Sequence, residues 1–231
     1  MRADLFVANK LNISRNKAQE LLENEKVLIN NEVKKASDKI LQDYECKLLD
    51  EVYVSRAAYK LKGFLEEFEL EISGIDCLDV GSSTGGFTQI LLENNALSVT
   101  CVDVGDKQLH NSLRANPKVK VFENTDIRDF KSAPFEIVVC DLSFISARLI
   151  INDLIRLSSK YLIILFKPQF EVGINVKRSK NGVVKDEKAV LKSCEEFEKE
   201  VIRLGLILLK KSKSKLSGKD GNYEYFYAFS K

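Results

Sequence analysis

Apolar and polar positions along most of this chain alternate between a rhythm typical of strands and one typical of helices. Short apolar runs bounded by polar or glycine residues predict buried strands at 75–80, 98–103, 119–123, 135–141 and 161–167. Apolar residues at helical spacing predict one helix that begins at Ser55 and four more that span 85–94, 106–114, 145–157 and 187–203. Two more runs, 204–211 and 223–230, predict a closing hairpin. This alternation indicates an α/β fold, a parallel sheet with helices on both faces.

The first 46 residues follow a different pattern and predict a separate, small α+β domain. Apolar residues suit a helix from Leu5 to Leu11 and a second helix that Ser14 caps. Two brief strands then flank the turn Asn30-Asn31. So short a segment can barely bury a core of its own. We therefore expect a domain at 1–46, a linker at 47–54 and a second domain at 55–231.

Composition narrows the classes of protein to which the chain can belong. A hydrophobic fraction of 45% supplies a sizeable core, and no run approaches the roughly 18 apolar residues of a membrane span. The N-terminus lacks the apolar stretch of a signal peptide. The five cysteines show no metal-like spacing, and their odd number, with three in predicted buried strands, indicates a reducing compartment. These features predict a cytoplasmic protein. The net charge is only +2, but residues 160–231 carry 16 lysines and arginines against nine acids, which indicates one positive face.

A glycine-rich turn after the strand at 75–80 is the first candidate binding element. It runs Asp79-Val80-Gly81-Ser82-Ser83-Thr84-Gly85-Gly86-Phe87, between a strand and a helix. Glycines at such a turn let a ligand lie against the main chain. The spacing fits neither the dinucleotide fingerprint nor the phosphate-binding P-loop, which needs a lysine where Phe87 stands. A purely structural turn is the alternative.

Acidic residues close several of the predicted strands, at the edge where open α/β sheets bind their ligands. Asp103, about 20 residues beyond the glycine turn, suits the hydroxyls of a ribose. Asp126 suits an adenine amino group or, alternatively, caps a helix. Together with the glycine turn, these acids indicate an S-adenosylmethionine pocket. Its candidate residues are Asp79, Gly81, Ser83, Thr84, Gly85, Gly86, Phe87, Asp103, Asp126 and Asp141.

Asp141 and Lys167 differ from the other charged residues at strand ends. Each follows a strongly apolar strand, which brings an ionised group to the edge of a low-dielectric interior. Burial and a neighbouring carboxylate act in opposite directions on a lysine amine, and proteins use that balance to make lysine a base. A structural ion pair is the alternative interpretation.

The N-terminal segment resembles the S-four-type RNA-binding domain, named after a ribosomal protein of the small subunit. The match rests on Arg2…Leu5…Ser14-Arg15…Ala18-Gln19…Val27…Ile29-Asn30. The resemblance implies that basic side chains contact RNA phosphates. The candidates are Arg2, Arg15, Lys17, Lys34 and Lys35. Arg56, in the second domain, is a separate candidate, because it shares a helical face with Lys60 and two like charges there are either a solvated pair or an anion site. An ordinary solvated face is the alternative, since residues 1–50 carry nine basic and nine acidic side chains.

The chain as a whole resembles the TlyA family, whose members carry the name haemolysin as well as the name ribosomal-RNA methyltransferase. Beyond the glycine turn, the matching motifs include Val102-Asp103-Val104-Gly105, Asp141-Leu142-Ser143-Phe144-Ile145-Ser146, Lys167-Pro168-Gln169-Phe170-Glu171-Val172-Gly173 and Gly221-Asn222-Tyr223-Glu224. The resemblance implies a Rossmann-like, S-adenosylmethionine-dependent methyltransferase domain similar to FtsJ, with a Lys-Asp-Lys-Glu catalytic set. By motif, that set is Lys60, Asp141, Lys167 and Glu224.

The resemblance also implies a reaction, the 2′-O-methylation of a cytidine ribose in ribosomal RNA, with no metal and no membrane partner. The chain begins and ends close to the family motifs, as in shorter members, which modify 23S rRNA of the large subunit, whereas longer members also modify 16S rRNA. It departs from the family in the tetrapeptide between the domains, because it has no tryptophan and places Tyr53-Val54 there.

In the expected mechanism, Asp141 and Glu224 hold Lys167, which orients and deprotonates the 2′-hydroxyl. Lys60 anchors the adjacent phosphate or shares the carboxylates. We expect a basic rim to contact the RNA backbone, and its residues are Lys177, Arg178, Lys180, Lys210, Lys211, Lys213 and Lys215.

Three rival functions stay open. A membrane-active haemolysin needs an export route and an amphipathic or spanning segment, and the sequence offers neither. A small-molecule methyltransferase leaves the N-terminal domain and the paired lysines without a role. A non-catalytic RNA-binding protein would retain the S-adenosylmethionine pocket without using it for methyl transfer.

Overall fold

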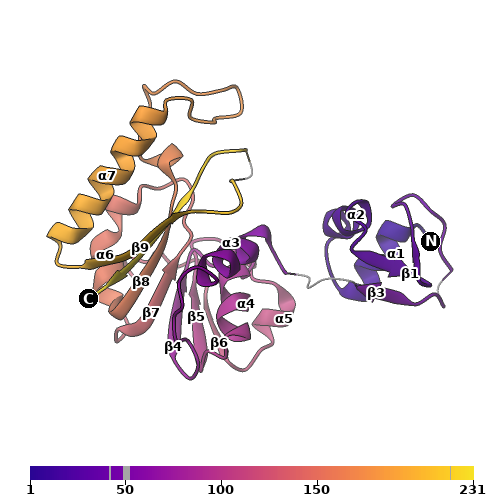
Figure 1. Ribbon diagram of the computed structural model, residues 1–231. Coiled ribbons are helices and arrows are strands. Elements are labelled where there is room, and N and C mark those ends of the chain that lie inside the picture. Colours follow the sequence, from indigo (N-terminus) through magenta and orange to yellow (C-terminus); the bar gives the residue numbers. More distant parts are fainter. Residues whose placement is uncertain (42, 49–52, 219) are drawn as a thin grey trace. The chain divides into compact units, whose positions relative to one another are not determined.

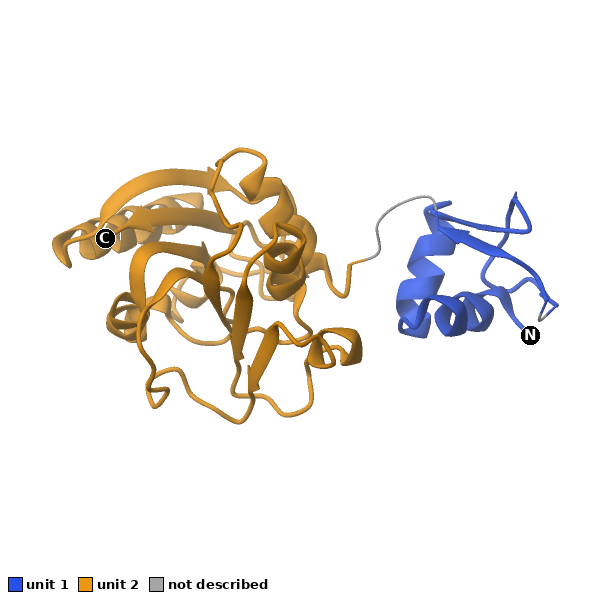
Figure 2. Ribbon diagram, turned by 90° about the horizontal axis from the view of Figure 1, so that it is seen from below, with its two compact units in different colours: residues 1–52 blue, residues 53–231 orange. Residues whose placement is uncertain are grey.

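Two units, residues 1–52 and 53–231, make up the chain (Figure 2). The structure is a computed structural model that describes residues 1–41, 43–48, 53–218 and 220–231. Of the expected linker at 47–54, residues 49–52 lie outside the described residues. Residues 47 and 48 belong instead to a strand of the N-terminal unit, because Cys46 and Leu48 pack against its core. A three-residue strand is too short a pattern to be recognised in the sequence.

The N-terminal unit packs two helices against a three-stranded antiparallel sheet. The helices are α1 (Ala3–Leu11) and α2 (Arg15–Glu23), and the strands β1 (Val27–Ile29), β2 (Glu32–Val33) and β3 (Cys46–Leu48) lie in the order β2-β1-β3. The hydroxyl of Ser14 accepts a hydrogen bond from the backbone N–H of Lys17 at 3.2 Å, so the predicted helix cap is confirmed. A small core that includes Phe6, Leu21 and Ile29 holds the unit together.

The larger unit is a seven-stranded sheet in the order β6-β5-β4-β7-β8-β10-β9 (Figure 1). The five strands β4 to β8 run parallel, as predicted, and β10 runs antiparallel between β8 and β9. The strands are β4 (Asp76–Val80), β5 (Ser98–Val102), β6 (Val119–Phe122), β7 (Phe135–Cys140), β8 (Ser158–Phe166), β9 (Ile207–Lys213) and β10 (Tyr225–Ser230). The helices are α3 (Arg56–Leu65), α4 (Gly86–Glu93), α5 (Asn111–Arg114), η1 (Ala147–Leu149), α6 (Ile151–Leu157), η2 (Pro168–Phe170) and α7 (Glu187–Arg203).

Two hydrophobic cores cover the two faces of this sheet, because successive residues of a strand point to opposite sides. On one face, strand residues such as Cys77 and Val139 pack with α3 and α4. On the other, Leu78, Val138 and Phe166 pack with α6 and α7. Figure 1 shows these helix pairs on opposite sides of the strands. The described residues contain no helix long and apolar enough to cross a membrane.

Two helices are shorter than the sequence predicted. The helix expected at 106–114 is reduced to α5, because Lys107 adopts a left-handed backbone (φ +52°) and the ring of His110 caps the helix start by accepting from the N–H of Ser112. The helix expected at 145–157 is divided into η1 and α6 at Ile150, whose φ of −121° is not helical. In both places the apolar spacing is helical but the backbone turns.

Candidate active site

The carboxyl edge of the large sheet gathers charged residues from distant parts of the chain. Asp141 follows β7 and Lys167 follows β8, which are parallel neighbours. Glu224 reaches the same edge because it precedes β10, which runs antiparallel to β8 and pairs Tyr225 with Phe166. Lys60 comes from α3.

These four residues form two buried ion pairs. Nζ of Lys167 lies 2.6 Å from Oδ1 of Asp141, and Nζ of Lys60 donates to Oε2 of Glu224 at 2.6 Å. The Lys60 and Glu224 side chains are 10% and 3% exposed. The sequence had suggested that both carboxylates hold Lys167, but Glu224 contacts Lys60 instead, because α3 brings that lysine to the start of β10.

A cavity of about 180 Å³, the glycine-turn cavity, opens between the turn after β4 and the ends of β7 and β8. Gly81 has a φ of +76°, and a β-carbon there would lie 2.8 Å from the carbonyl oxygen of Asp141. A β-carbon on Gly86 would lie 2.2 Å from Oγ of Ser55. The two glycines thus keep the turn close to its neighbouring segments, and the cavity's shape depends on them.

The sequence had predicted many of the residues that line this cavity and had missed others. The predicted ones among them are Asp79, Gly81, Ser83, Thr84, Gly86, Phe87 and Asp141. The additional ones are Ser55, Ala57, Ser82 and Ser143, together with Lys167, which the sequence predicted as a catalytic residue but not as part of this cavity. Ser55 and Ala57 belong to the segment that leads into Lys60, where the sequence pattern predicted the start of a helix. No sequence signal singles out Ser143, whose place depends on the fold.

Asp79 lies at the floor of the glycine-turn cavity and is 1% exposed. Its Oδ2 accepts a hydrogen bond from the hydroxyl of Thr88 at 2.6 Å, while its Oδ1 has no hydrogen bond to any described residue. Burial raises the pKa of this carboxyl to about 7. An unsatisfied buried acceptor of this kind suits a polar or cationic group of a ligand.

Two predicted ligand residues, Asp103 and Asp126, are not among those that line the glycine-turn cavity, and neither is Gly85. Asp103 accepts from the backbone N–H groups of Ser83 at 2.8 Å and of Gly105 at 2.7 Å, and so holds the glycine turn in place. Asp126 accepts from the backbone and side chain of Arg128, which holds the pKa of its carboxyl near 2. The alternative to adenine recognition, a helix N-cap, is wrong as well, because residues 127–129 form a turn and not a helix, and Asp126 stabilises that turn.

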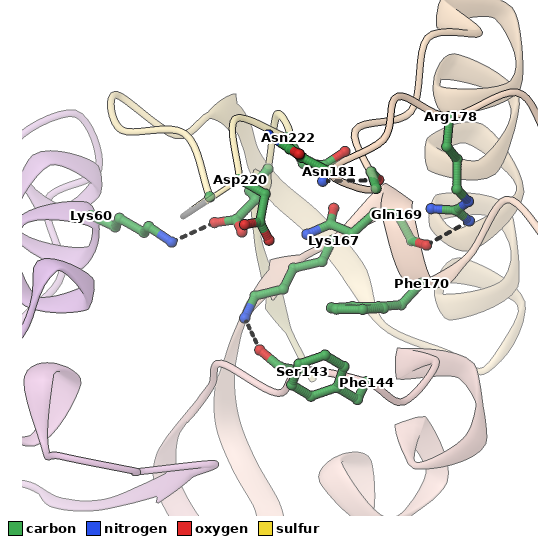
Figure 3. Close-up of a pocket in the computed structure, with 13 residues that line it drawn as sticks. Lys60, Ser143, Phe144, Lys167, Gln169, Phe170, Arg178, Asn181, Asp220 and Asn222 are labelled. Carbon is green, nitrogen blue, oxygen red and sulfur yellow. Dashed lines mark hydrogen bonds and ion pairs between the residues drawn. The ribbon is translucent and has the colours of Figure 1, made fainter.

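A wider cavity of about 520 Å³, the wide cavity, adjoins the first (Figure 3). Lys60, Lys167 and Glu224 line it, and Lys167 lines both cavities. Two aromatic rings, Phe144 and Phe170, stand at its wall with their centroids 5.4 Å apart, and Phe144 is 91% exposed. The described residues contain no cluster of three or more side chains that could hold a metal ion.

The predicted RNA-binding residues of the N-terminal unit are partly arranged around one acid. Arg2 and Arg15 both donate to the carboxylate of Asp4, with contacts of 3.1 and 3.0 Å, and each guanidinium is about half exposed. Asp4 itself is 1% exposed, and the hydrogen bond from Arg2 lowers the pKa of its carboxyl to about 2. Lys17 and Lys34 pair with glutamates of their own segments.

The basic residues of the larger unit are likewise partly paired. Arg56 donates to the carbonyl of Ser217 at 3.3 Å. Within the expected rim, Lys211 pairs with Glu198 and Lys215 with Glu66. Arg178 donates to two backbone carbonyls, one of them that of Gln169, and lines the wide cavity (Figure 3).

Comparison with known proteins matches both units to described families. Residues 53–231 match the FtsJ-like methyltransferase family and residues 1–45 the S4 domain. The chain is therefore an FtsJ-like methyltransferase that carries an S4 domain at its N-terminus. Its fold is shared with S-adenosylmethionine-dependent methyltransferases, such as one from Listeria monocytogenes with a TM-score of 0.56 at 14% identity over 77% of this chain and 99% of that one.

Relatives that match the whole chain show to which family of FtsJ-like methyltransferases it belongs. The chain is 52% identical to a Campylobacter jejuni protein named 23S rRNA (cytidine-2'-O)-methyltransferase TlyA, and the match covers all of both chains. A solved structure described as a hemolysin from Streptococcus thermophilus has a TM-score of 0.74 and 31% identity, over 100% of this chain and 88% of that one. The chain belongs to the TlyA family. The expected fold, an α/β methyltransferase sheet with a small N-terminal domain, is confirmed.

Proposed function

We propose that this chain methylates the ribose 2′-hydroxyl of a cytidine in 23S rRNA of the large ribosomal subunit, in the cytoplasm, with S-adenosylmethionine as the methyl donor. Its full-length relative from Campylobacter jejuni carries the name of this activity. The S4 domain at residues 1–45 and the half-exposed Arg2 and Arg15 support an RNA substrate. The single observation that carries the proposal is that Lys167 lines both cavities beside a carboxylate.

The glycine-turn cavity is our candidate for the cofactor. Its glycines let the turn pack closely against Asp141 and Ser55, which shapes the cavity, and the unsatisfied Oδ1 of Asp79 suits the ammonium group of S-adenosylmethionine. When bound, the cofactor supplies a methyl group activated by its sulfonium. Asp103 then acts through the turn, by fixing the Ser83 amide, and Asp126 has no proposed contact with the cofactor.

The wide cavity is our candidate for the RNA, and Lys167 acts where the cavities meet. Lys167 orients the 2′-hydroxyl with one N–H and, in its neutral form, accepts the proton as the oxygen takes up the methyl group. Asp141 holds the amine at 2.6 Å and stabilises the ammonium that results. Lys60, fixed by Glu224, attracts the adjoining phosphate. Alignment of the reacting atoms can supply roughly 7–11 kcal/mol of the barrier.

The test is transfer of labelled methyl groups from S-adenosylmethionine to 23S rRNA and to large subunits, followed by mapping of the modified nucleotide. We expect Lys167→Ala to lose at least about 100-fold in rate, the usual contribution of a general base, with cofactor affinity retained. Lys120→Ala, on the exposed face of β6, is the matched control and should transfer normally.

Each rival function predicts a different result. Transfer to a base instead of a ribose, or no transfer to any ribosomal RNA, would refute the proposal. Lysis of cells by the purified protein without S-adenosylmethionine would favour a haemolysin. RNA binding without any transfer would favour a non-catalytic role.

A further inference from the structure

Among the described residues, two line both cavities, Ser143 and Lys167. Nζ of Lys167 donates a hydrogen bond to Oγ of Ser143 at 2.8 Å (Figure 3). The same nitrogen lies 2.6 Å from Oδ1 of Asp141. The amine therefore contacts two residues, Asp141 and Ser143, and both belong to the segment that follows β7. The catalytic set implied by the sequence includes Asp141 but not this serine.

Two contacts constrain a lysine amine in a way that one contact does not. The lysine stem has four flexible carbons, so an ion pair to Asp141 alone fixes the distance of the nitrogen but leaves it free to pivot. The hydrogen bond to Ser143, added to this ion pair, fixes the direction of the remaining position on nitrogen. That position is available to a group at the junction of the two cavities.

The backbone around Ser143 is held in an uncommon conformation. Phe144 has a left-handed backbone (φ +66°), which bulky residues rarely adopt unless their surroundings impose it. Glu171, whose side chain is 2% exposed, accepts hydrogen bonds from the hydroxyl of Ser146 and the N–H of Ala147, both at 2.7 Å. Since Glu171 follows Lys167 closely in the chain, this carboxylate ties the segment that carries the serine to the segment that carries the lysine.

We infer that Ser143 is a positioning residue, which aims the amine of Lys167 at the acceptor hydroxyl, and that Glu171 holds its segment for that purpose. The inference rests on the proposed function of Lys167. It assigns to Ser143 a role in orientation and none in cofactor binding.

The experiment measures kcat and KM for RNA, and Kd for S-adenosylmethionine, in full-length Ser143→Ala and Ser143→Thr. Misplacement of a reacting group by about 1 Å can cost about 100-fold in rate. We expect Ser143→Ala to lower kcat by about 10- to 100-fold, with KM and Kd close to wild type. Ser143→Thr should restore most of kcat, because its hydroxyl can accept the same hydrogen bond and the exposed site has room for a methyl group. Ser73→Ala, an exposed serine ahead of β4, is the matched control.

Three results would overturn the inference. In the first, Ser143→Ala keeps wild-type kcat. In the second, the alanine and threonine variants are equally slow. In the third, cofactor binding falls in proportion to kcat. Different results would refute the proposed function itself: wild-type protein that transfers no methyl group to RNA, or a Lys167→Ala variant that stays active. Retained cofactor binding in Ser143→Ala shows that the variant is folded.

Discussion

The buried pair of Lys60 and Glu224 allows stability and activity to be separated. Glu224→Gln leaves the ammonium of Lys60 buried without a charged partner. At an effective dielectric constant of about 20, unit charges at this separation attract by about 6 kcal/mol, and desolvation of the two ions offsets much of that. Loss of one partner of a buried pair typically costs about 3–5 kcal/mol, whereas replacement of both by apolar residues of similar volume is close to neutral.

We therefore expect Glu224→Gln to destabilise the larger unit by about 3–5 kcal/mol, which corresponds to roughly 10 °C in Tm. The double variant Lys60→Met/Glu224→Leu should unfold within about 1 kcal/mol of wild type. Both variants should lose methyl transfer, because neither offers a charged Lys60 held by a carboxylate to the RNA phosphate.

The assay is urea unfolding of the full-length chain, followed by tyrosine fluorescence. Six of the seven tyrosines lie in residues 53–231, so this signal reports mainly on the larger unit. Equal destabilisation of the single and double variants would refute the reasoning, because the cost would then come from lost contacts and not from an unpaired charge. Wild-type transfer by the double variant would remove the pair from the proposed mechanism.

Three further predictions concern other parts of the molecule. Because the folded pKa of Asp79 is raised to about 7, wild-type stability should fall as pH rises from about 4 to 7, and Asp79→Asn should abolish that slope in Tm while it weakens cofactor binding. Asp4→Asn removes a negative charge, yet we expect weaker RNA binding, because Arg2 and Arg15 lose the acid that holds them. Gly81→Ala should cost more stability than the roughly 1–2 kcal/mol of a left-handed alanine and should abolish cofactor binding, because its β-carbon meets the Asp141 carbonyl.

Two of these predictions, those for Gly81→Ala and Asp4→Asn, have a control within the chain. Gly74→Ala has a similar φ, +73°, with nothing within 4 Å of the new β-carbon, so the difference between the two variants isolates the clash. Asp43→Asn removes an exposed acid from the N-terminal unit, and binding assays across a salt series should separate its electrostatic effect from that of Asp4→Asn. RNA binding that strengthens in Asp4→Asn, or an unchanged pH slope in Asp79→Asn, would contradict the corresponding argument.

Local patterns in the sequence predicted the elements of the sheet and most of the glycine-turn cavity. Runs of apolar residues that are short and bounded by glycine or polar residues favour buried strands, and a glycine turn after such a strand restricts where a ligand fits. The same patterns failed within 106–114, where Lys107 has a left-handed backbone, and within 145–157, where the φ of Ile150 is not helical. Apolar spacing indicates which side chains are buried but carries no information on the backbone torsion angles.

The sequence by itself determined the alternation of strands and helices, the glycine turn and the identity of the charged groups at the strand ends, because each of these depends on residues close together in the chain. Only the tertiary structure decided that Glu224 pairs with Lys60 and that Ser143 contacts Lys167. Both contacts join residues brought together by the order of strands and by one antiparallel insertion. That order is set by the packing of two whole cores, and no short segment of the chain carries it.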